Sequence, residues 1–382
     1  MKILGYYPNY FGDGGIAHAS YNIMKNMQSD DAVVKLYGLA SEPIFDDPFY
    51  ADIIPRWSKS IVYKVISNDK ILKFGENFLL KKMTDDVDIA YLWPGISIDV
   101  YKEIKARGKK IIYEGVNTHE AYSKDILDRE YQSLGLTAKH HVSPEKVIVE
   151  SEKLELADYV YSASPLMTES YLKNNVDPAK ILPTSYGLHN RYVYDIDINS
   201  KRVKDRELTF IFVGTIDVRK GIHLLLKYWV QAGLKAKLKI VGRIDSVVEE
   251  MVTSYLSKYD NIEHVPYTSD LGTIYKNADV FILPSLEEGS PLVTYLAMGA
   301  SLPVIVSPMG GGGVIQNDVE GFVIDPHDAD AWVDALRTLA NDESLREKFA
   351  RNSGAKVHDY TWEEVGKRRL DALKHAYYKE GS

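Results

Sequence analysis

The chain has 382 residues, which is more than one compact hydrophobic core usually supports, so we expect two domains. Its 45% hydrophobic and 26% charged residues are ordinary for a globular protein, while a formal net charge of −8 argues against a nucleic-acid partner. There are no cysteines, which excludes disulfide bonds, thiolate metal sites and a cysteine nucleophile. The sequence enters a strand at once, without the apolar region of a signal peptide, and no apolar run approaches the roughly 20 residues that span a bilayer. We therefore expect a cytoplasmic protein.

Strand-like and helix-like runs alternate along the first half of the chain, a pattern typical of a parallel sheet covered on both faces. The expected strands are 3–7, 33–37, 88–93, 110–113, 159–162 and 181–183, and the expected helices include 16–27, 145–156 and 165–173. After the first strand comes a turn with Gly14 and Gly15, where the backbone could approach a ligand closely; a flexible turn is the alternative. Between about 114 and 143 we expect an irregular connection.

A polar stretch at 194–206 has no periodicity, which is typical of a linker, and a second alternating series follows it. The expected strands are 208–213, 238–241, 280–283, 303–306 and 322–324, and the expected helices are 221–230, 247–256, 292–298 and 329–339. A terminal helix should begin after Thr361, its N-cap. We therefore predict an α/β protein with two Rossmann-like parallel-sheet domains, 1–195 and 205–360, that face a central cleft.

The strongest functional signal lies between 278 and 309. Two carboxylates, Glu287 and Glu288, follow an apolar strand, and Gly289 and Ser290 come just before a helix start. This order brings backbone N–H groups and a carboxylate to the carboxyl edge of a sheet, where ligands of open α/β sheets bind. The N–H groups could bind a phosphate, and the carboxylate could accept hydrogen bonds from sugar hydroxyls.

A second signal begins where strand 208–213 ends at Gly214. Arg219 and Lys220 then precede a helix start. An arginine offers a planar fork of donors to phosphate oxygens and a lysine adds a compact charge, so the pair predicts a diphosphate site. The alternative is a solvated pair of cations on a loop.

Histidines and paired aspartates are the other candidates. His119 follows strand 110–113 and could bind a sugar hydroxyl or a carbonyl, although a lone histidine is often structural. Adjacent histidines such as His140 and His141 rarely chelate one ion. Three Asp-x-Asp triplets, which could in principle hold a metal ion, begin at Asp86, Asp195 and Asp328. In so acidic a chain we attribute them to chance. We therefore expect no metal and no cofactor.

The segment at 284–304 resembles the donor-site signature of retaining GT-B glycosyltransferases of the family-4 type. The matching residues are Pro284, Ser285, Glu288, Gly289, Ala297, Met298, Pro303 and Val304. Three positions differ: Ser290 replaces a phenylalanine, Pro291 replaces a glycine, and Leu296 replaces the second glutamate of the E-x7-E pair. The resemblance implies a GT-B fold in which a terminal helix, 361–382, returns to the first domain.

The resemblance also implies a function. A sugar would pass with retention from a nucleoside diphosphate sugar to a glycan, lipid or small-molecule acceptor, without a metal. The first domain would bind the acceptor and the second the donor. The implied catalytic residues are Glu288, His119, Lys220 and Arg219. The implied donor-binding residues are Gly14, Gly15, Gly214, Arg219, Lys220, Arg243, Glu288, Gly289, Ser290, Leu292 and Val293.

Leu296 leaves a rival hypothesis open, a non-catalytic GT-B-fold partner or regulator of a glycosylation complex. Arg219, Lys220 and Glu288 favour the enzyme, because buried charges need partners. An epimerase on the same fold would need further cleft acids and bases, which the sequence does not locate.

Residues 56–82 contain seven basic residues and two acidic ones, with apolar residues interleaved at roughly helical spacing. Two interpretations stay open. The segment could make a peripheral membrane contact with anionic lipid, or it could be a helix pair that packs on the first sheet and exposes a basic face to solvent.

Overall fold

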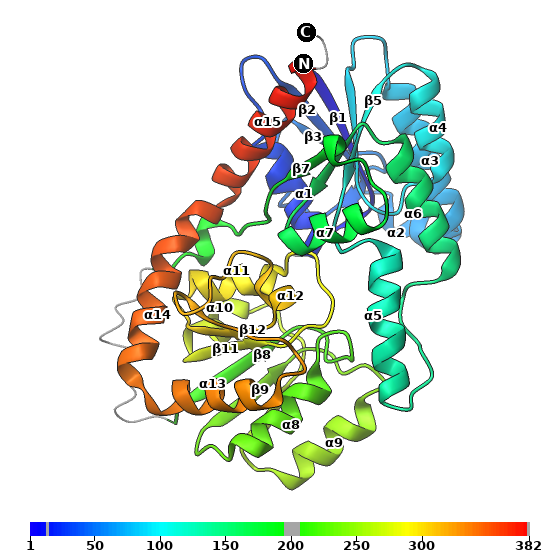
Figure 1. Ribbon diagram of the computed structural model, residues 1–382. Helices are drawn as coiled ribbons and strands as arrows, with labels where there is room; N and C mark the ends of the chain where they lie inside the picture. The colour runs from blue at the N-terminus through cyan, green and yellow to red at the C-terminus, as the bar shows by residue number, and fades with distance from the viewer. Residues whose placement is uncertain (13–14, 195–206, 380–382) are drawn as a thin grey trace.

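The computed structural model describes residues 1–12, 15–194 and 207–379, which form two α/β lobes stacked one above the other (Figure 1). The linker expected at 194–206 falls almost wholly outside the described residues. No helix among the described residues combines the length and the apolar character needed to cross a bilayer.

The first lobe is built on a seven-stranded sheet, in which every described strand pair is parallel and the order is β3-β2-β1-β4-β5-β6-β7. Its strands are β1 (Lys2–Phe11), β2 (Val33–Ser41), β3 (Tyr50–Asp52), β4 (Ile89–Leu92), β5 (Lys110–Glu114), β6 (Tyr159–Ser162) and β7 (Ile181–Pro183). Its helices are α1 (Gly15–Lys25), α2 (Lys59–Val65), α3 (Asn68–Lys82), α4 (Ile98–Ala106), α5 (Glu120–Ser133), α6 (Pro144–Leu156) and α7 (Pro165–Lys173), with short 3-10 turns η1 (Pro178–Lys180) and η2 (Asn190–Tyr192). All residues of β4 and β6 are buried, which explains why these strands are apolar runs rather than alternating ones.

The second lobe repeats this design with a six-stranded parallel sheet in the order β10-β9-β8-β11-β12-β13. Its strands are β8 (Thr209–Val213), β9 (Lys237–Val241), β10 (Ile262–Val265), β11 (Val280–Leu283), β12 (Val304–Val306) and β13 (Gly321–Val323). Its helices are α8 (Ile222–Ala232), α9 (Glu249–Lys258), α10 (Leu271–Lys276), α11 (Leu292–Gly299), α12 (Pro308–Gly311), α13 (Ala329–Asn341) and α14 (Glu343–Lys356), followed by the turn η3 (Val357–Tyr360). The prediction of two parallel-sheet α/β domains is confirmed.

The last helix, α15 (Trp362–Lys379), leaves the second lobe and packs against α1 of the first (Figure 1). Arg369 in this helix is fully buried. Its guanidinium lies 2.8 Å from the carboxylate of Glu114 at the end of β5 and donates a hydrogen bond of 3.1 Å to the carbonyl of Ser185. The first lobe is therefore assembled from two distant parts of the chain.

The irregular connection expected between 114 and 143 is wrong, because 14 of its residues form helix α5. Figure 1 shows that α5 extends from the first lobe alongside the second. Its buried residues are Ser123, Leu127, Glu130 and Tyr131. Two of these four are polar, so the helix carries no apolar stripe from which a helix could be predicted.

Candidate active site

The loops that follow β5 and β11 meet between the two lobes. A Cβ atom on Gly289 would lie 1.9 Å from the carbonyl oxygen of Val116, so only glycine allows the two backbones to approach this closely. Thr118 donates a 2.7 Å hydrogen bond from its hydroxyl to the carboxylate of Glu287. The carboxyl edges of the two sheets thus face each other across a joint site.

Two cations and two carboxylates of the second lobe gather at this site. The Nη1 atom of Arg219 lies 3.3 Å from the carboxylates of both Glu287 and Glu288. Lys220 forms an ion pair with Glu288. All except Arg219 are buried, with exposed fractions of 8% for Lys220, 5% for Glu288 and 0% for Glu287. The structure therefore brings Arg219, Lys220 and Glu288 together.

The turn between β8 and α8 fixes the position of both cations. Gly221 has φ 72°, in the left-handed region, and a Cβ atom there would lie 2.2 Å from the carbonyl oxygen of Pro284. The backbone N–H of Lys220 donates to Asp217, and the carbonyl of Arg219 accepts from Leu286. The turn is thus locked against the loop after β11, which carries the two carboxylates.

Burial changes the proton affinity of this cluster. Burial and the positive charge of neighbouring Arg219 lower the pKa of the Lys220 ammonium to about 7. A bound anion would favour the charged form of the ammonium and raise its pKa again. Lys220 can therefore couple the binding of an anionic ligand to the uptake of a proton.

His119 caps the amino end of α5. Its Nδ1 accepts a 3.1 Å hydrogen bond from the backbone N–H of Ala121, which leaves the ring proton on Nε2. Burial lowers the pKa of His119 to about 4, so the ring is neutral near pH 7. Nε2 is buried and has no hydrogen-bond partner among the described residues. A buried N–H without a partner next to the joint site fits a ligand oxygen.

A pocket of about 790 Å³ adjoins the charged cluster, a volume in the range of nucleotide and other small-molecule sites. Gly214, Arg243 and Val293 line it, as does Gly242. A Cβ atom on Gly214 would lie 3.6 Å from Cε of Lys220, so the pocket opens directly beside that side chain. Three of the residues predicted to bind a donor therefore share one cavity.

The second lobe matches a known family. Residues 194–356 fit the family described as "Glycosyl transferases group 1". The second lobe is therefore similar to the group 1 glycosyltransferases.

One relative is the capsular polysaccharide biosynthesis glycosyltransferase CapM of Staphylococcus aureus, which is 27% identical over 229 residues, 56% of this chain and 59% of that protein. The first three curated relatives are matched over 59%, 54% and 49% of their lengths, so the chain spans about half of them. The sucrose-phosphate synthase from Thermosynechococcus elongatus is a structural neighbour with a TM-score of 0.71 and 19% identity, covering 99% of both chains. HepE from Anabaena, solved in complex with UDP and glucose, has a TM-score of 0.69 and 15% identity and covers 98% of this chain and 100% of its own. These neighbours confirm the GT-B fold.

The structure describes all but one of the remaining predicted residues. Ser290 is buried and shares a 2.7 Å hydrogen bond with the hydroxyl of Tyr295. Leu292 begins α11, and the N–H groups of a first helical turn have no partner within the helix. Gly15 begins α1 with φ 58°, whereas Gly14 lies outside the described residues. Leu296 is half-buried and packs against the core.

Sequence reasoning missed Glu287 and Thr118 as partners across the lobes. The two adjacent glutamates were visible in the sequence, but nothing indicated that one would pair with a cation and the other would also bind the first lobe. The signal that could have found them is the pair of strand ends, β5 and β11, that a GT-B fold brings face to face.

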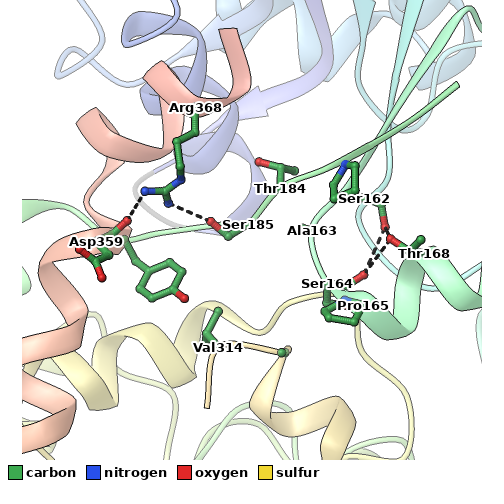
Figure 2. Close-up of a pocket in the computed structure, with 14 residues that line it drawn as sticks. Ser162, Ala163, Ser164, Pro165, Thr168, Thr184, Ser185, Val314, Asp359 and Arg368 are labelled. Atoms are coloured by element: carbon green, nitrogen blue, oxygen red, sulfur yellow. Dashed lines mark hydrogen bonds between the residues drawn. The ribbon is translucent and has the colours of Figure 1, made fainter. Parts of the chain in front are cut away.

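A further hollow between the lobes has a volume of about 690 Å³ (Figure 2). Figure 2 shows Arg368 reaching Ser185 and the carbonyl of Asp359, while hydroxyl side chains line the opposite wall. Gly313 lies against Pro165 here, since a Cβ atom would come within 2.3 Å of its ring. None of the predicted donor-binding residues lines this hollow.

One member of the histidine pair considered as a metal site, His140, is engaged by a carboxylate. His140 lies 2.7 Å from the carboxylate of Asp128. Among the described residues, no group of three or more histidine, aspartate and glutamate side chains is placed to hold a metal ion.

Proposed function

We propose that this protein is a retaining glycosyltransferase that moves a sugar from a nucleoside diphosphate sugar to an acceptor without a metal. The observation that carries the proposal is the ion-pair cluster of Arg219, Lys220 and Glu288 beside a pocket of about 790 Å³. The cations suit a diphosphate, the carboxylate can accept hydrogen bonds from a sugar, and the adjoining cavity is large enough for a nucleoside.

The donor would lie along the second lobe. Its nucleoside would occupy the pocket between Gly214, Arg243 and Val293, and its diphosphate would meet Arg219 and Lys220. The N–H groups at the start of α11 would add donors to the phosphate. Gly289 and Ser290 would border the sugar, and Glu288 would accept hydrogen bonds from its hydroxyls. HepE, a structural neighbour, was solved in complex with UDP and glucose, which supports a nucleoside diphosphate sugar as the donor.

Catalysis would rest on stabilising the leaving group. When the bond between the sugar and the diphosphate breaks, negative charge develops on the phosphate oxygen, close to Arg219 and Lys220. The departing oxygen would take the proton of the acceptor hydroxyl on the same face of the sugar, which gives retention. The neutral His119 would donate from Nε2 to the sugar, and closure of the lobes would exclude water.

The acceptor would bind on the first lobe and be a glycan or a lipid-linked glycan. The name of CapM, which refers to capsular polysaccharide, supports a glycan product. We also propose the cytoplasmic location expected from the sequence, because the donors of this reaction would be nucleoside diphosphate sugars.

A thermal-shift screen against UDP, GDP and ADP tests the donor site first, because a ligand that binds only the native state raises the melting temperature. Sugar donors that contain the stabilising nucleotide are then tested for turnover. The assay contains a chelator, because the proposed reaction needs no metal. NMR of the product then gives the anomeric configuration. Inversion, or a requirement for a divalent ion, would contradict the corresponding part of the proposal.

Leu296 supports one competing function, a non-catalytic partner of a glycosylation complex. The family's second glutamate bonds the ribose, and its loss would weaken donor binding by roughly ten- to a hundredfold. Absence of both binding and hydrolysis with every nucleoside diphosphate sugar would favour this alternative over the enzyme.

A further inference from the structure

Helix α2 is a surface helix that contacts the apolar core only through the half-buried Val62. None of its seven residues is buried, and between positions 60 and 70 only Val62 is even half-buried. A helix that packed on the sheet would bury one face, as α3 does with Ile71, Gly75 and Leu79. The packed helix pair considered from the sequence therefore describes α3, whereas α2 packs through one side chain and leaves most of its surface exposed.

Large apolar side chains are concentrated on this part of the surface. Six of the fourteen exposed large hydrophobic residues in the described part of the chain lie between 57 and 74. Trp57 is 83% exposed, Val65 77%, Ile61 63% and Phe74 55%. Apolar patches of this kind mark interaction sites on soluble proteins. We call residues 53–74 the α2–α3 surface.

The α2–α3 surface also contains an apolar pocket of about 410 Å³. Its walls include Ile53, Ile54, Val62, Ile66, Ile71 and Phe74. Lys70 is the charged side chain among the lining residues. A pocket lined by hydrocarbon with an ammonium group nearby matches a ligand that has an apolar chain and an anionic head.

The charges around the pocket identify the partner. Lys64, Lys70 and Lys73 are exposed and form no ion pair with the described residues, in a chain whose net charge is −8. An acidic protein partner would complement these lysines but would not need the apolar pocket. An anionic lipid surface complements both, because basic residues bind its headgroups while apolar side chains enter the boundary with the acyl chains.

Part of the α2–α3 surface lies at the carboxyl edge of the first sheet. Ile53 and Ile54 follow the carboxyl end of β3, on the same sheet edge as the joint site. Lys59 of α2 donates a 2.7 Å hydrogen bond to the hydroxyl of Tyr10, near the carboxyl end of β1. A membrane in contact with this surface would therefore adjoin the carboxyl edge of the first sheet.

We propose that the α2–α3 surface binds anionic phospholipid membranes and that its pocket takes up one acyl chain. The membrane contact goes beyond sugar transfer and can be measured without it. A protein that transfers no sugar could still bind lipid, and an active enzyme could ignore lipid, so the two proposals fail separately.

Co-sedimentation of the full chain with phosphatidylcholine vesicles, with and without phosphatidylglycerol, measures the contact. We expect binding to the vesicles that contain phosphatidylglycerol and little to the neutral ones. Each lysine near an anionic surface contributes roughly fivefold in affinity. The double variant Lys64→Glu/Lys73→Glu should therefore bind at least about tenfold more weakly. Equal binding to both vesicle types would overturn the proposal.

Tryptophan fluorescence reports the same contact independently. Trp57 is exposed, whereas the other four tryptophans are buried: Trp93, Trp229, Trp332 and Trp362. Emission should shift to shorter wavelength when vesicles with phosphatidylglycerol are added, and Trp57→Phe should abolish the shift. A shift that persists in this variant would place the contact elsewhere.

Matched controls separate the surface from general stickiness. The apolar variant Ile61→Ser/Val65→Ser should lose vesicle binding, while Ile148→Ser, at a residue 59% exposed on α6, should keep it. Lys235→Glu, exposed before β9, is the control for charge. If Ile61→Ser/Val65→Ser instead converts a dimer to a monomer and leaves lipid binding unchanged, the surface is an interface between copies of the chain and the proposal is wrong.

Discussion

The two lobes present different chemistry to the cleft that they share. The second lobe contributes charge: Arg219 and Lys220 are held against Glu287 and Glu288. The first lobe contributes neutral groups, namely the hydroxyl of Thr118 and the carbonyl of Val116, together with the ring of His119. The two tasks are therefore divided between the lobes: the second lobe stabilises charge, and the first lobe contributes to closure and positioning.

The largest effect is expected on the charged side. Lys220→Met keeps the aliphatic stem but removes the ammonium group, so kcat/KM for sugar transfer should fall by about 100- to 1000-fold. The kcat/KM of Glu288→Gln should fall by a similar factor, because its carboxylate is proposed to bind the donor sugar. Lys237→Met is the control, because Lys237 is paired with Glu263 at the amino end of β9. Wild-type kinetics in Lys220→Met would refute the division of tasks.

Closure depends on the smallest side chain at the joint site. In Gly289→Ala the new methyl group would collide with the carbonyl of Val116, so the lobes must separate. A displacement of about 1 Å at a reacting centre costs on the order of 100-fold in rate. We expect this loss in kcat/KM, with nucleoside diphosphate affinity nearly unchanged. Gly272→Ala is the control, because its new methyl group would meet only side-chain ends, those of Tyr194 and Asp270. A loss of nucleotide binding in Gly289→Ala would contradict the role in closure.

His119 has two functions that substitutions can separate. His119→Asn keeps a side-chain acceptor at the N-cap of α5 but removes the buried Nε2–H. We expect about tenfold lower kcat/KM with little change in melting temperature. His119→Ala should lose the same activity and also about 1 kcal/mol of stability. Equal activity of His119→Asn and the wild type would make the histidine purely structural.

The smallest expected effect concerns protons. Because burial lowers the pKa of Lys220 to about 7, its side chain should be mostly an uncharged amine at pH 8, and a bound diphosphate should restore the proton. Binding at pH 8 should therefore take up close to one proton, and affinity should decrease between pH 7 and 9 by up to about tenfold per unit. Calorimetry in two buffers of different ionisation enthalpy measures this uptake. Lys220→Met should show none, and a wild type without uptake would contradict the lowered pKa.

Sequence patterns predicted the second lobe's site better than the first lobe's. The strand at Val280–Leu283 and the start of α11 agree with the prediction, since a buried parallel strand is an uninterrupted apolar run and a glycine-containing turn marks its end. Local order alone placed Arg219, Lys220 and Glu288 at one sheet edge.

The first lobe's part could not be predicted in the same way. Helix α5 is held by contacts with the other lobe, such as the 2.7 Å pair between Glu130 and His223, which are 93 residues apart. The bond between Thr118 and Glu287 spans 169 residues. Polar contacts over such separations leave no periodic trace in a sequence. The short edge strands β3 and β10 were also missed.

The return of α15 to the first lobe has a consequence for synthesis. Glu114 is buried at the end of β5, and its cation, Arg369, lies 255 residues later in the chain. Until that arginine leaves the ribosome, the nascent first lobe must hold an uncompensated charge in its interior, at a cost of roughly 3–5 kcal/mol. The lobe that is translated first is therefore expected to mature last, after the lobe that follows it has already folded.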